Sequence, residues 1–333
     1  MTKTTFHSIN LSQFNFLVTG GAGFIGSHIV DYLIQHNAGK VRVLDNLSNG
    51  YFENIQEHLD KPNFEFIEGD IRDFETCQKA VKGIDYISHQ AALGSVPRSI
   101  ENPILTNDVN ISGFLNMLVA AKESKQVKRF IYAASSSTYG DSPALPKVEG
   151  NEGNPLSPYA VTKAVNEYYG DVFSKVYGFH TIGLRYFNIF GPKQNPNNPY
   201  AAVIPIFCKA FLDGKSPTIN GDGKTSRDFT YVENAVQANI KALLAPELQE
   251  HTVFNVACGD QVSLNEMIDE LQLISSSELK ANYGPERRGD VKHSKASIKK
   301  INEILNYQPT VKFGEGLKRV FQWYKENMIN QDA

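Results

Sequence analysis

Leu17-Val18-Thr19-Gly20-Gly21-Ala22-Gly23-Phe24-Ile25-Gly26-Ser27-His28 is the stretch that decides the fold of this chain. A short apolar run that ends at Val18 leads into four glycines within seven residues. Apolar residues then recur at helical spacing from Ile29 to Ile34. This order predicts a strand, a glycine turn and a helix.

The glycine spacing suits a bound dinucleotide. Gly20 or Gly21 lets the chain turn sharply, and Gly26 lets the helix pack close to its strand. Gly23 removes a side chain where a pyrophosphate approaches the backbone, and the helix N-terminus offers N–H groups and a partial positive charge to the phosphates. The sequence therefore predicts a dinucleotide phosphate site formed by Gly20, Gly23, Phe24, Ile25 and Gly26.

An acid at the end of the next apolar run bears on the identity of the dinucleotide. Residues 41–45 read as the second strand, and Asp45 lies about twenty residues after the glycine turn, where a carboxylate takes both adenosine ribose hydroxyls. A carboxylate there repels a 2′-phosphate, so NAD is favoured over NADP. The alternative is a glycine-rich turn in an unrelated α/β protein. Three small polar residues are predicted to wrap the ribose: Asn46, Ser48 and Gly50.

Strands and helices alternate through the first half of the chain. Residues 64–70, 84–89 and 130–134 read as further strands, which predicts a Rossmann-type doubly wound parallel sheet with right-handed crossovers. Ligands of such a sheet bind beyond the carboxyl ends of the strands. The residues placed there for the cofactor are Asp70 and Ile71, near the adenine, and Gln90, Ala91 and Ala92.

Two polar residues near this edge have other predicted roles. His89 is interpreted as a packed or capped histidine rather than a catalytic one. Residues 109–121 have helical periodicity, and Asn110 is a candidate for tying that helix to the active site, with Asn107 nearly as good.

Composition excludes several classes of function. The 333 residues carry a net charge of −3, so no basic surface calls for nucleic acid or anionic lipid. The three cysteines are scattered, which favours reduced thiols in a cytoplasmic protein over disulfides or a metal site. We expect no metal and no membrane partner, because no metal-ligand cluster, signal-type segment or membrane-length apolar stretch is found.

The texture of the chain changes after Arg185. Residues 191–200 are crowded with Pro, Asn and Gly, and the remainder mixes short strands with helices. We predict a smaller mixed α/β substrate lobe that covers the cofactor cleft. The predicted NAD-binding domain comprises residues 14–186 with chain returns near 228–257, and the predicted substrate lobe comprises residues 187–227 and 258–329.

A serine run and a Tyr-x-x-x-Lys motif carry the candidate chemistry. Tyr159 and Lys163 are four residues apart and share a helix face. The ordinary pKa of a phenol is about 10, and a nearby ammonium and an oxidised nicotinamide both favour the phenolate, so Tyr159 is a candidate base. Ser135, at the end of the strand, is placed to hold the substrate hydroxyl and share its proton. Its neighbours Ser136 and Ser137 are grouped with it as candidate catalytic residues.

With these motifs in place, the chain resembles the extended branch of the short-chain dehydrogenase/reductases. The resemblance covers about residues 14–328 and includes residues 19–26, the serine run, Tyr159-x-x-x-Lys163, residues 184–188, residues 227–229 and residues 287–290. Within the branch the chain looks most like the UDP-hexose 4-epimerases, and closest to those acting on N-acetylated sugars. That resemblance implies NAD-dependent interconversion of UDP-GlcNAc and UDP-GalNAc, a homodimer, and a role in polysaccharide biosynthesis.

The resemblance also implies roles for individual residues. Tyr186 is placed near the nicotinamide ribose; Asn188 and the backbone around Ala202 and Val203 contact the sugar and diphosphate. Arg227 and Arg287 clamp the diphosphate, and Asp290 binds the uridine ribose. Ser294 walls the sugar pocket, where a bulky aromatic residue would exclude an N-acetyl group, and Gly94, Ser95 and Ser137 look like further small wall residues.

Rival chemistries on this scaffold differ at the serine run. Nucleotide-sugar 4,6-dehydratases of this family carry an Asp-Glu pair where this chain has Ser136 and Ser137, and UDP-glucuronate decarboxylases typically keep a nearby Glu. Hydroxyls cannot perform that acid–base work, so an enzyme that only oxidises and re-reduces C4 is favoured. The alternatives are a dehydratase or decarboxylase, and a non-catalytic NAD-binding sensor.

Overall fold

The computed structural model describes residues 4–196, 202–246, 248–286 and 292–328. Its centre is a seven-stranded parallel sheet in the order β11-β6-β5-β4-β1-β2-β3. The strands are β1 (Asn15–Thr19), β2 (Lys40–Asp45), β3 (Phe64–Glu68), β4 (Tyr86–His89), β5 (Arg129–Ser135), β6 (Thr181–Tyr186) and β11 (Thr252–Val256). The order reverses between β1 and β4, so the Rossmann-type doubly wound fold is confirmed.

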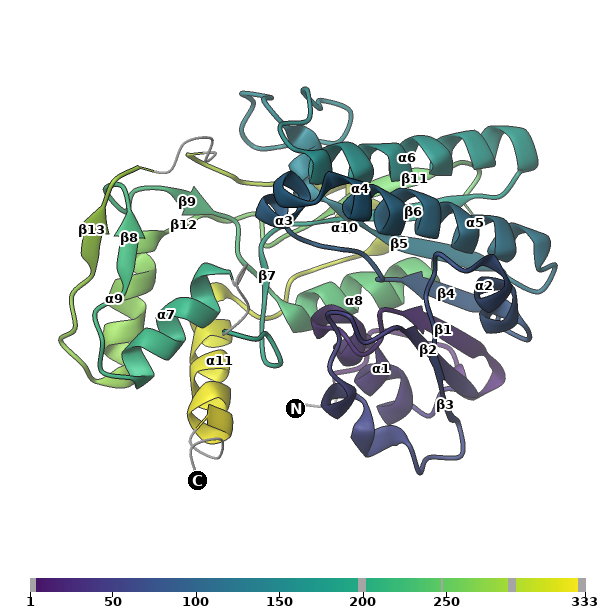
Figure 1. Ribbon diagram of the computed structural model, residues 1–333, viewed down its shortest axis with the longest axis horizontal. Helices are drawn as coiled ribbons and strands as arrows, with labels where there is room; N and C mark the ends of the chain where they lie inside the picture. The colour runs from purple at the N-terminus through teal and green to yellow at the C-terminus, as the bar shows by residue number, and fades with distance from the viewer. Residues whose placement is uncertain (1–3, 197–201, 247, 287–291, 329–333) are drawn as a thin grey trace.

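Helices cover both faces of the sheet (Figure 1). One face carries α1 (Phe24–Gln35), α8 (Val232–Leu243) and α10 (Lys299–Leu305). The other carries α2 (Phe74–Val81), α5 (Phe114–Glu123) and α6 (Pro158–Tyr177), with the short helices α3 (Val96–Glu101) and α4 (Pro103–Asn107) beside α6.

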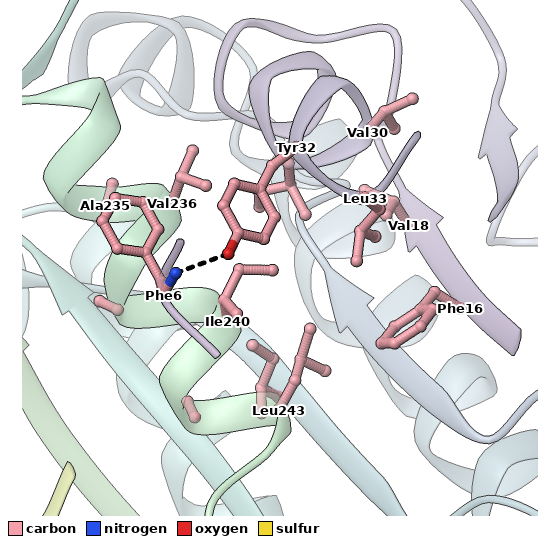
Figure 2. Close-up of a cluster of buried hydrophobic side chains, with 14 of the residues drawn as sticks. Phe6, Phe16, Val18, Val30, Tyr32, Leu33, Ala235, Val236, Ile240 and Leu243 are labelled. Atoms are coloured by element: carbon pink, nitrogen blue, oxygen red, sulfur yellow. Dashed lines mark hydrogen bonds between the residues drawn. The ribbon is translucent and has the colours of Figure 1, made fainter. Parts of the chain in front are cut away.

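The core beneath α1 and α8 closes one face of the sheet. Figure 2 shows side chains of α8, among them Val236 and Ile240, facing Tyr32 and Leu33 of α1. The Tyr32 hydroxyl accepts a hydrogen bond of 2.7 Å from the backbone N–H of Phe6. Helix α8 comes about two hundred residues after α1 in the sequence, so this core joins distant parts of the chain.

A smaller lobe lies to one side of the sheet (Figure 1). Its core is built from α7 (Val203–Leu212), α9 (Leu264–Ser275) and α11 (Phe313–Met328). Short paired strands accompany these helices: β7 (Ile189–Phe190) with β10 (Thr230–Tyr231), β8 (Thr218–Asn220) with β13 (Asn282–Gly284), and β9 (Ser226–Arg227) with β12 (Val262–Ser263). The chain returns to the sheet at β11, which pairs with β6. The division into two domains at the residues given above stays a prediction.

The helix predicted over residues 109–121 starts differently from the prediction. A π-helical turn, η4 (Asp108–Gly113), precedes α5. Short π-helical turns inside α-helices are frequent at functional sites. Here the turn contains Asn110, and the side chain of that residue is buried.

Candidate active site

A cavity of about 510 Å³ runs along the carboxyl ends of the sheet strands. It is bounded by the turns that follow β1, β2, β3, β4, β5 and β6. The predicted site residues that line it are Gly20, Gly23, Phe24, Ile25, Gly26, Asp45, Asn46, Ser48, Gly50, Asp70, Ile71, Gln90, Ala91, Ala92, Gly94, Ser135, Ser136, Tyr159, Lys163, Tyr186 and Asn188. Residues from both halves of the chain therefore meet in one cavity.

The glycine turn leaves no space for side chains. Gly20 has φ +67°, so it is the residue that makes the sharp turn, and a Cβ on it would lie 2.7 Å from the Ala91 backbone nitrogen. A Cβ on Gly26 would lie 2.1 Å from the carbonyl oxygen of Gly20. Gly23 caps α1 without any side-chain hydrogen bond, so the first N–H groups of the helix are left for an anion. This cradle fits a dinucleotide pyrophosphate.

Asp45 sits at the end of β2 beside that turn. One carboxylate oxygen accepts from the Ala22 N–H at 3.0 Å and the other from the Leu47 N–H at 2.9 Å. Burial raises the pKa of Asp45, and these backbone hydrogen bonds oppose that rise. The carboxylate lines the cavity next to Gly50, where ribose hydroxyls would meet it.

Asp70, after β3, lines the same cavity and is paired with Arg72. Hydrogen bonds from Arg72 lower the pKa of Asp70 to about 2, and Asn46 donates a further hydrogen bond of 2.8 Å. Asp70 is therefore an anion that lines the cavity at the position predicted for the adenine.

Ser135, Tyr159 and Lys163 come together from two elements. Ser135 ends β5, while Tyr159 and Lys163 lie in the first turns of α6, which Ser157 caps. The Ser135 hydroxyl lies close enough to the Tyr159 phenol to lower its pKa, and the Lys163 Nζ donates to the Ala133 carbonyl at 2.7 Å. Ser137 donates its hydroxyl proton to the Ser135 oxygen at 2.9 Å, but it does not line the cavity.

The pKa of Tyr159 differs from the sequence-based expectation. Burial raises it, and the nearby Ser135 hydroxyl only partly offsets that rise. Burial also lowers the pKa of Lys163 to about 8. The prediction of a lowered phenol pKa rested on the Lys163 ammonium together with an oxidised nicotinamide; in the protein by itself, removal of the ring from water raises the pKa.

Asn110 ties α6, the helix that carries Tyr159 and Lys163, to the loop after β4. Its amide oxygen accepts from the Leu93 N–H at 2.8 Å, and its amide nitrogen donates to Thr162 of α6 at 3.1 Å. Asn107, the alternative candidate, is exposed. Asn110 thus joins the loop after β4 to α6 and does not itself line the cavity.

Tyr186 belongs to a buried polar network that sequence reasoning missed. Its hydroxyl donates to Gln90 at 3.0 Å and accepts from Asn239 of α8 at 2.7 Å. Ser88 donates to the same Asn239 at 3.1 Å. No local motif marks Asn239, because α8 reaches the site only through the return of the chain to the sheet. The network fixes two predicted cofactor residues.

His89 is a packed residue, as predicted. Its ring stacks on Phe130, its Nδ1 lies 2.8 Å from the Thr19 hydroxyl, and burial lowers its pKa to about 3. It is therefore neutral at physiological pH and unsuited to proton transfer there.

The predicted substrate residues divide into two groups. Asn188 lines the cavity and has φ +38°, a backbone conformation that asparagine tolerates better than most residues. Ser95 instead caps α3, where it accepts from the Arg98 N–H, and Ala202 caps α7, which begins at Val203. These last three residues do not line the cavity.

Arg227 and Ser294 lie together outside the cavity lining. The Ser294 N–H donates to the carbonyl of Ser226, and Arg227 donates to the carbonyl of Lys292 at 3.3 Å. Arg287 and Asp290 lie outside the described residues. The neighbouring Asp228 is fully buried and accepts backbone hydrogen bonds from Cys258, Gly259 and Ala296, so it ties this strand to two distant segments.

Several lining residues were not predicted. They are Leu44, Asn49, Gly69, Leu93, Val109, Ala133, Ala134, Ile189 and Gln194. Most are sequence neighbours of predicted residues at strand ends, which is the signal that could have found them. Gln194 lacks such a signal, because it lies in the irregular loop after β7.

One group of possible metal ligands occurs among the described residues: Asp31, Glu57 and His58. The group lies outside the cavity lining. Asp31 already contacts His58 at 2.7 Å and Lys193 at 2.8 Å. All three cysteines are buried and unpaired. Within the described ranges, no helix is both long and apolar enough to cross a bilayer.

Known proteins match the chain along most of its length. The NAD-dependent epimerase/dehydratase family matches residues 16–257. A solved UDP-N-acetylglucosamine 4-epimerase from Methanobrevibacter ruminantium is 41% identical, with a TM-score of 0.89, and the match covers 95% of this chain and 99% of that one. A UDP-glucose 4-epimerase from Thermotoga maritima is 35% identical, with a TM-score of 0.88 over 94% of this chain and 99% of that one.

A UDP-glucose 4-epimerase from Mycolicibacterium smegmatis is 33% identical over 93% of this chain and 98% of its own length. The family match, the order of the strands in the sheet and the glycine cradle all indicate the same NAD-binding fold. The chain belongs to the NAD-dependent epimerase/dehydratase family, and its cofactor is NAD.

Proposed function

We propose that this protein interconverts UDP-GlcNAc and UDP-GalNAc by oxidising the sugar at C4 and re-reducing the 4-keto sugar on its other face. The observation that carries the proposal is the placement of Ser135, Tyr159 and Lys163 together in the lining of the cavity that also holds the dinucleotide cradle. A base, its proton relay and its cation thus lie where a sugar hydroxyl would meet the cofactor.

The hydroxyl geometry gives the proton a defined route. Because Ser137 donates to the Ser135 oxygen, the Ser135 proton is left for the nearby Tyr159 phenol, whose pKa Ser135 lowers. Ser135 therefore stabilises the phenolate, and Tyr159 accepts the C4 hydroxyl proton and later returns it. Lys163 adds positive charge on the same helix face. NAD, when bound, accepts the C4 hydride and returns it.

The serine run favours epimerisation over the rival reactions. The side chains of Ser136 and Ser137 are hydroxyls, which cannot act as the acid–base pair that elimination of water requires. Product mass separates the possibilities, because epimerisation leaves the mass unchanged while loss of water or carbon dioxide lowers it. A non-catalytic sensor has no need of Ser135, Tyr159 and Lys163 together in the cavity lining.

Small residues support an acetylated sugar. Gly94 lines the cavity and a Cβ on it would have no atom within 4 Å, so open space adjoins it. Ser294 is a small residue beside Arg227, the predicted diphosphate clamp. The solved relative from Methanobrevibacter ruminantium, itself a UDP-N-acetylglucosamine 4-epimerase, points the same way.

The direct test is incubation of the purified protein with UDP-GlcNAc without added NAD, followed by separation of the sugar products. We expect UDP-GalNAc of unchanged mass, because NAD is regenerated in each cycle and stays bound. Replacing Ser294 by Tyr should lower turnover of the acetylated sugars by a factor at least ten times larger than the factor for UDP-glucose. A steric clash that costs about 1.4 kcal/mol in the transition state corresponds to a tenfold lower rate. Unchanged turnover of UDP-GlcNAc by Ser294→Tyr would remove the argument from pocket size.

We further propose that the protein is a homodimer formed through α6 and the neighbouring short helices. The outer face of α6 carries an apolar stripe at helical spacing, in which Tyr168 is 70% and Val176 is 63% exposed. Ile104 of α4, beside α6, is 74% exposed. Exposed apolar side chains on neighbouring helices are compatible with an isologous interface with a second copy.

Charges placed on this face should separate the copies. We expect Tyr168→Glu with Val172→Glu to halve the mass measured by light scattering, because two carboxylates would be buried against their symmetry mates. Leu273→Glu is the matched control, since Leu273 is 77% exposed on α9 and far along the chain from this face. A wild-type protein of monomer mass would contradict the proposal.

A further inference from the structure

We propose that Glu167 is a positioning residue for the reaction: with Arg185 it fixes the Tyr159–Lys163 face of α6 against the Ser135 turn and balances the charge of the Lys163 ammonium. The inference rests on the proposed function, because it takes Tyr159 and Lys163 to be the catalytic pair. It assigns a role to a buried carboxylate outside the cavity lining.

Glu167 continues the catalytic face of α6. Tyr159, Lys163 and Glu167 follow at intervals of four residues and so lie one above another along one face of the helix. The Glu167 side chain is only 13% exposed. A carboxylate at this depth needs strong partners.

Arg185 of β6 is that partner. Its Nε donates to one Glu167 oxygen at 2.8 Å and its Nη2 to the other at 2.6 Å, which is a two-pronged guanidinium–carboxylate pair. The same guanidinium also binds Glu152 and lies 4.8 Å from the centre of the Tyr139 ring. Tyr139 ends the 3-10 turn η5 (Ser136–Tyr139), which Ser135 caps. The arginine therefore links helix α6 to the turn that carries the serine hydroxyls.

The charges of this cluster balance. Lys163 and Arg185 are the cations, and Glu167 and Glu152 are the anions. Burial lowers the pKa of Lys163 to about 8, and the Glu167 carboxylate opposes that fall. Burial also raises the pKa of Glu167, against its hydrogen bonds from Arg185. Without Glu167, the buried cations Lys163 and Arg185 would have only Glu152, a partly exposed acid, to balance their charge.

Other titratable groups face this cluster but keep their charge state through neutral pH. Burial lowers the pKa of His89 on β4 to about 3 and raises that of Tyr132 on β5 well above its ordinary value. Burial likewise raises the pKa of Tyr139 to about 12. Burial also lowers the pKa of His251, which senses the Arg185 charge, to about 4. Lys163, with a pKa of about 8, is therefore the group of this cluster that titrates closest to neutrality.

The variant that tests the proposal is Glu167→Gln, which keeps an acceptor for Arg185 and removes one negative charge. A more positive surrounding favours the phenolate and disfavours the ammonium. We expect both limbs of the pH profile of kcat to move to lower pH by about one unit, the size expected for a unit charge lost one helical turn from Lys163 and two turns from Tyr159 in a partly buried site. A purely structural loosening would lower kcat at every pH and leave both inflections in place.

Three further variants make the result decisive. Glu167→Asp retains the charge and should restore the wild-type inflections. Glu152→Gln removes an acid from the same guanidinium but not from the α6 face, and its inflections should stay within about 0.3 units of wild type. The double variant Glu167→Gln/Arg185→Gln removes one charge of each sign, so its inflections should return toward wild type even if Glu167→Gln alone folds poorly.

A measurement without substrate separates this inference from the proposed function. The chain has 15 tyrosines, so the phenolate absorbance of Tyr159 is taken as the difference between titrations of the NAD-bound protein with and without Tyr159→Phe. We expect the Tyr159 inflection to fall by about one unit in Glu167→Gln. Unmoved inflections in both titration and pH profile would overturn the role of Glu167. Absence of any epimerase activity in the wild type would instead overturn the proposed function.

Discussion

Replacing Tyr159 by phenylalanine is expected to lower turnover of UDP-GlcNAc about a thousandfold, within the usual range for loss of a general base. The ring remains to fill its place in the cavity, while the oxygen that lies close to Ser135 is removed. The C4 hydroxyl then has no acceptor for its proton. Initial rates of UDP-GalNAc formation at saturating substrate measure the effect.

The bound cofactor supplies the control for this variant. NAD released by denaturation should be equal in wild type and Tyr159→Phe, because the glycine cradle and Asp45 are untouched. Tyr177→Phe removes the hydroxyl of an exposed tyrosine at the other end of α6 and should leave turnover unchanged. Full activity in Tyr159→Phe would exclude the mechanism.

Gly26→Ala is expected to cost the protein its cofactor. The new Cβ would meet the Gly20 carbonyl oxygen at 2.1 Å and the Gly21 Cα at 2.9 Å, and both are backbone atoms that cannot rotate away. The turn must open, and the N–H groups of α1 move off the pyrophosphate. A cost of about 2–3 kcal/mol corresponds to about 30- to 150-fold weaker retention of NAD.

NAD per chain after gel filtration measures this loss. Gly314→Ala, in α11, is the matched control, because its Cβ would have no neighbour closer than 3.6 Å. We expect full NAD content in that variant. Full NAD content in Gly26→Ala would show that the turn tolerates a methyl group and that the cradle does not depend on close backbone contact.

The local patterns predicted the sheet because they carry their own geometry. The glycine turn leads into α1, and Asp45 is the last residue of β2, as the spacing between the glycines and this acid predicted. Strand ends of a parallel sheet share one edge, so Gln90 and Tyr186, almost a hundred residues apart, could both be placed near the cofactor before their contact of 3.0 Å was known.

What the sequence could not predict depends on contacts between distant segments. Asn239 enters the site because α8 packs beneath the sheet, and nothing in its neighbourhood marks it. In the sequence, Glu167 is one acidic residue on a long helix, and its pairing with Arg185 of β6 is visible only in the folded structure. The raised pKa of Tyr159 in the protein without NAD was also missed, because burial is a property of the folded surroundings, whereas the Tyr-x-x-x-Lys spacing shows only the lysine.

The position of β11 constrains how the protein is made. The outermost strand is added only after the ribosome has synthesised residue 256, more than sixty residues beyond β6. Until then β6 presents an unpaired row of backbone N–H and C=O groups, which can pair with other nascent chains. A fragment that stops at residue 186 would retain the glycine cradle yet keep this open edge, and it would lack α8 beneath the sheet. The seven-stranded sheet is thus completed during synthesis by sequence that comes after part of the smaller lobe.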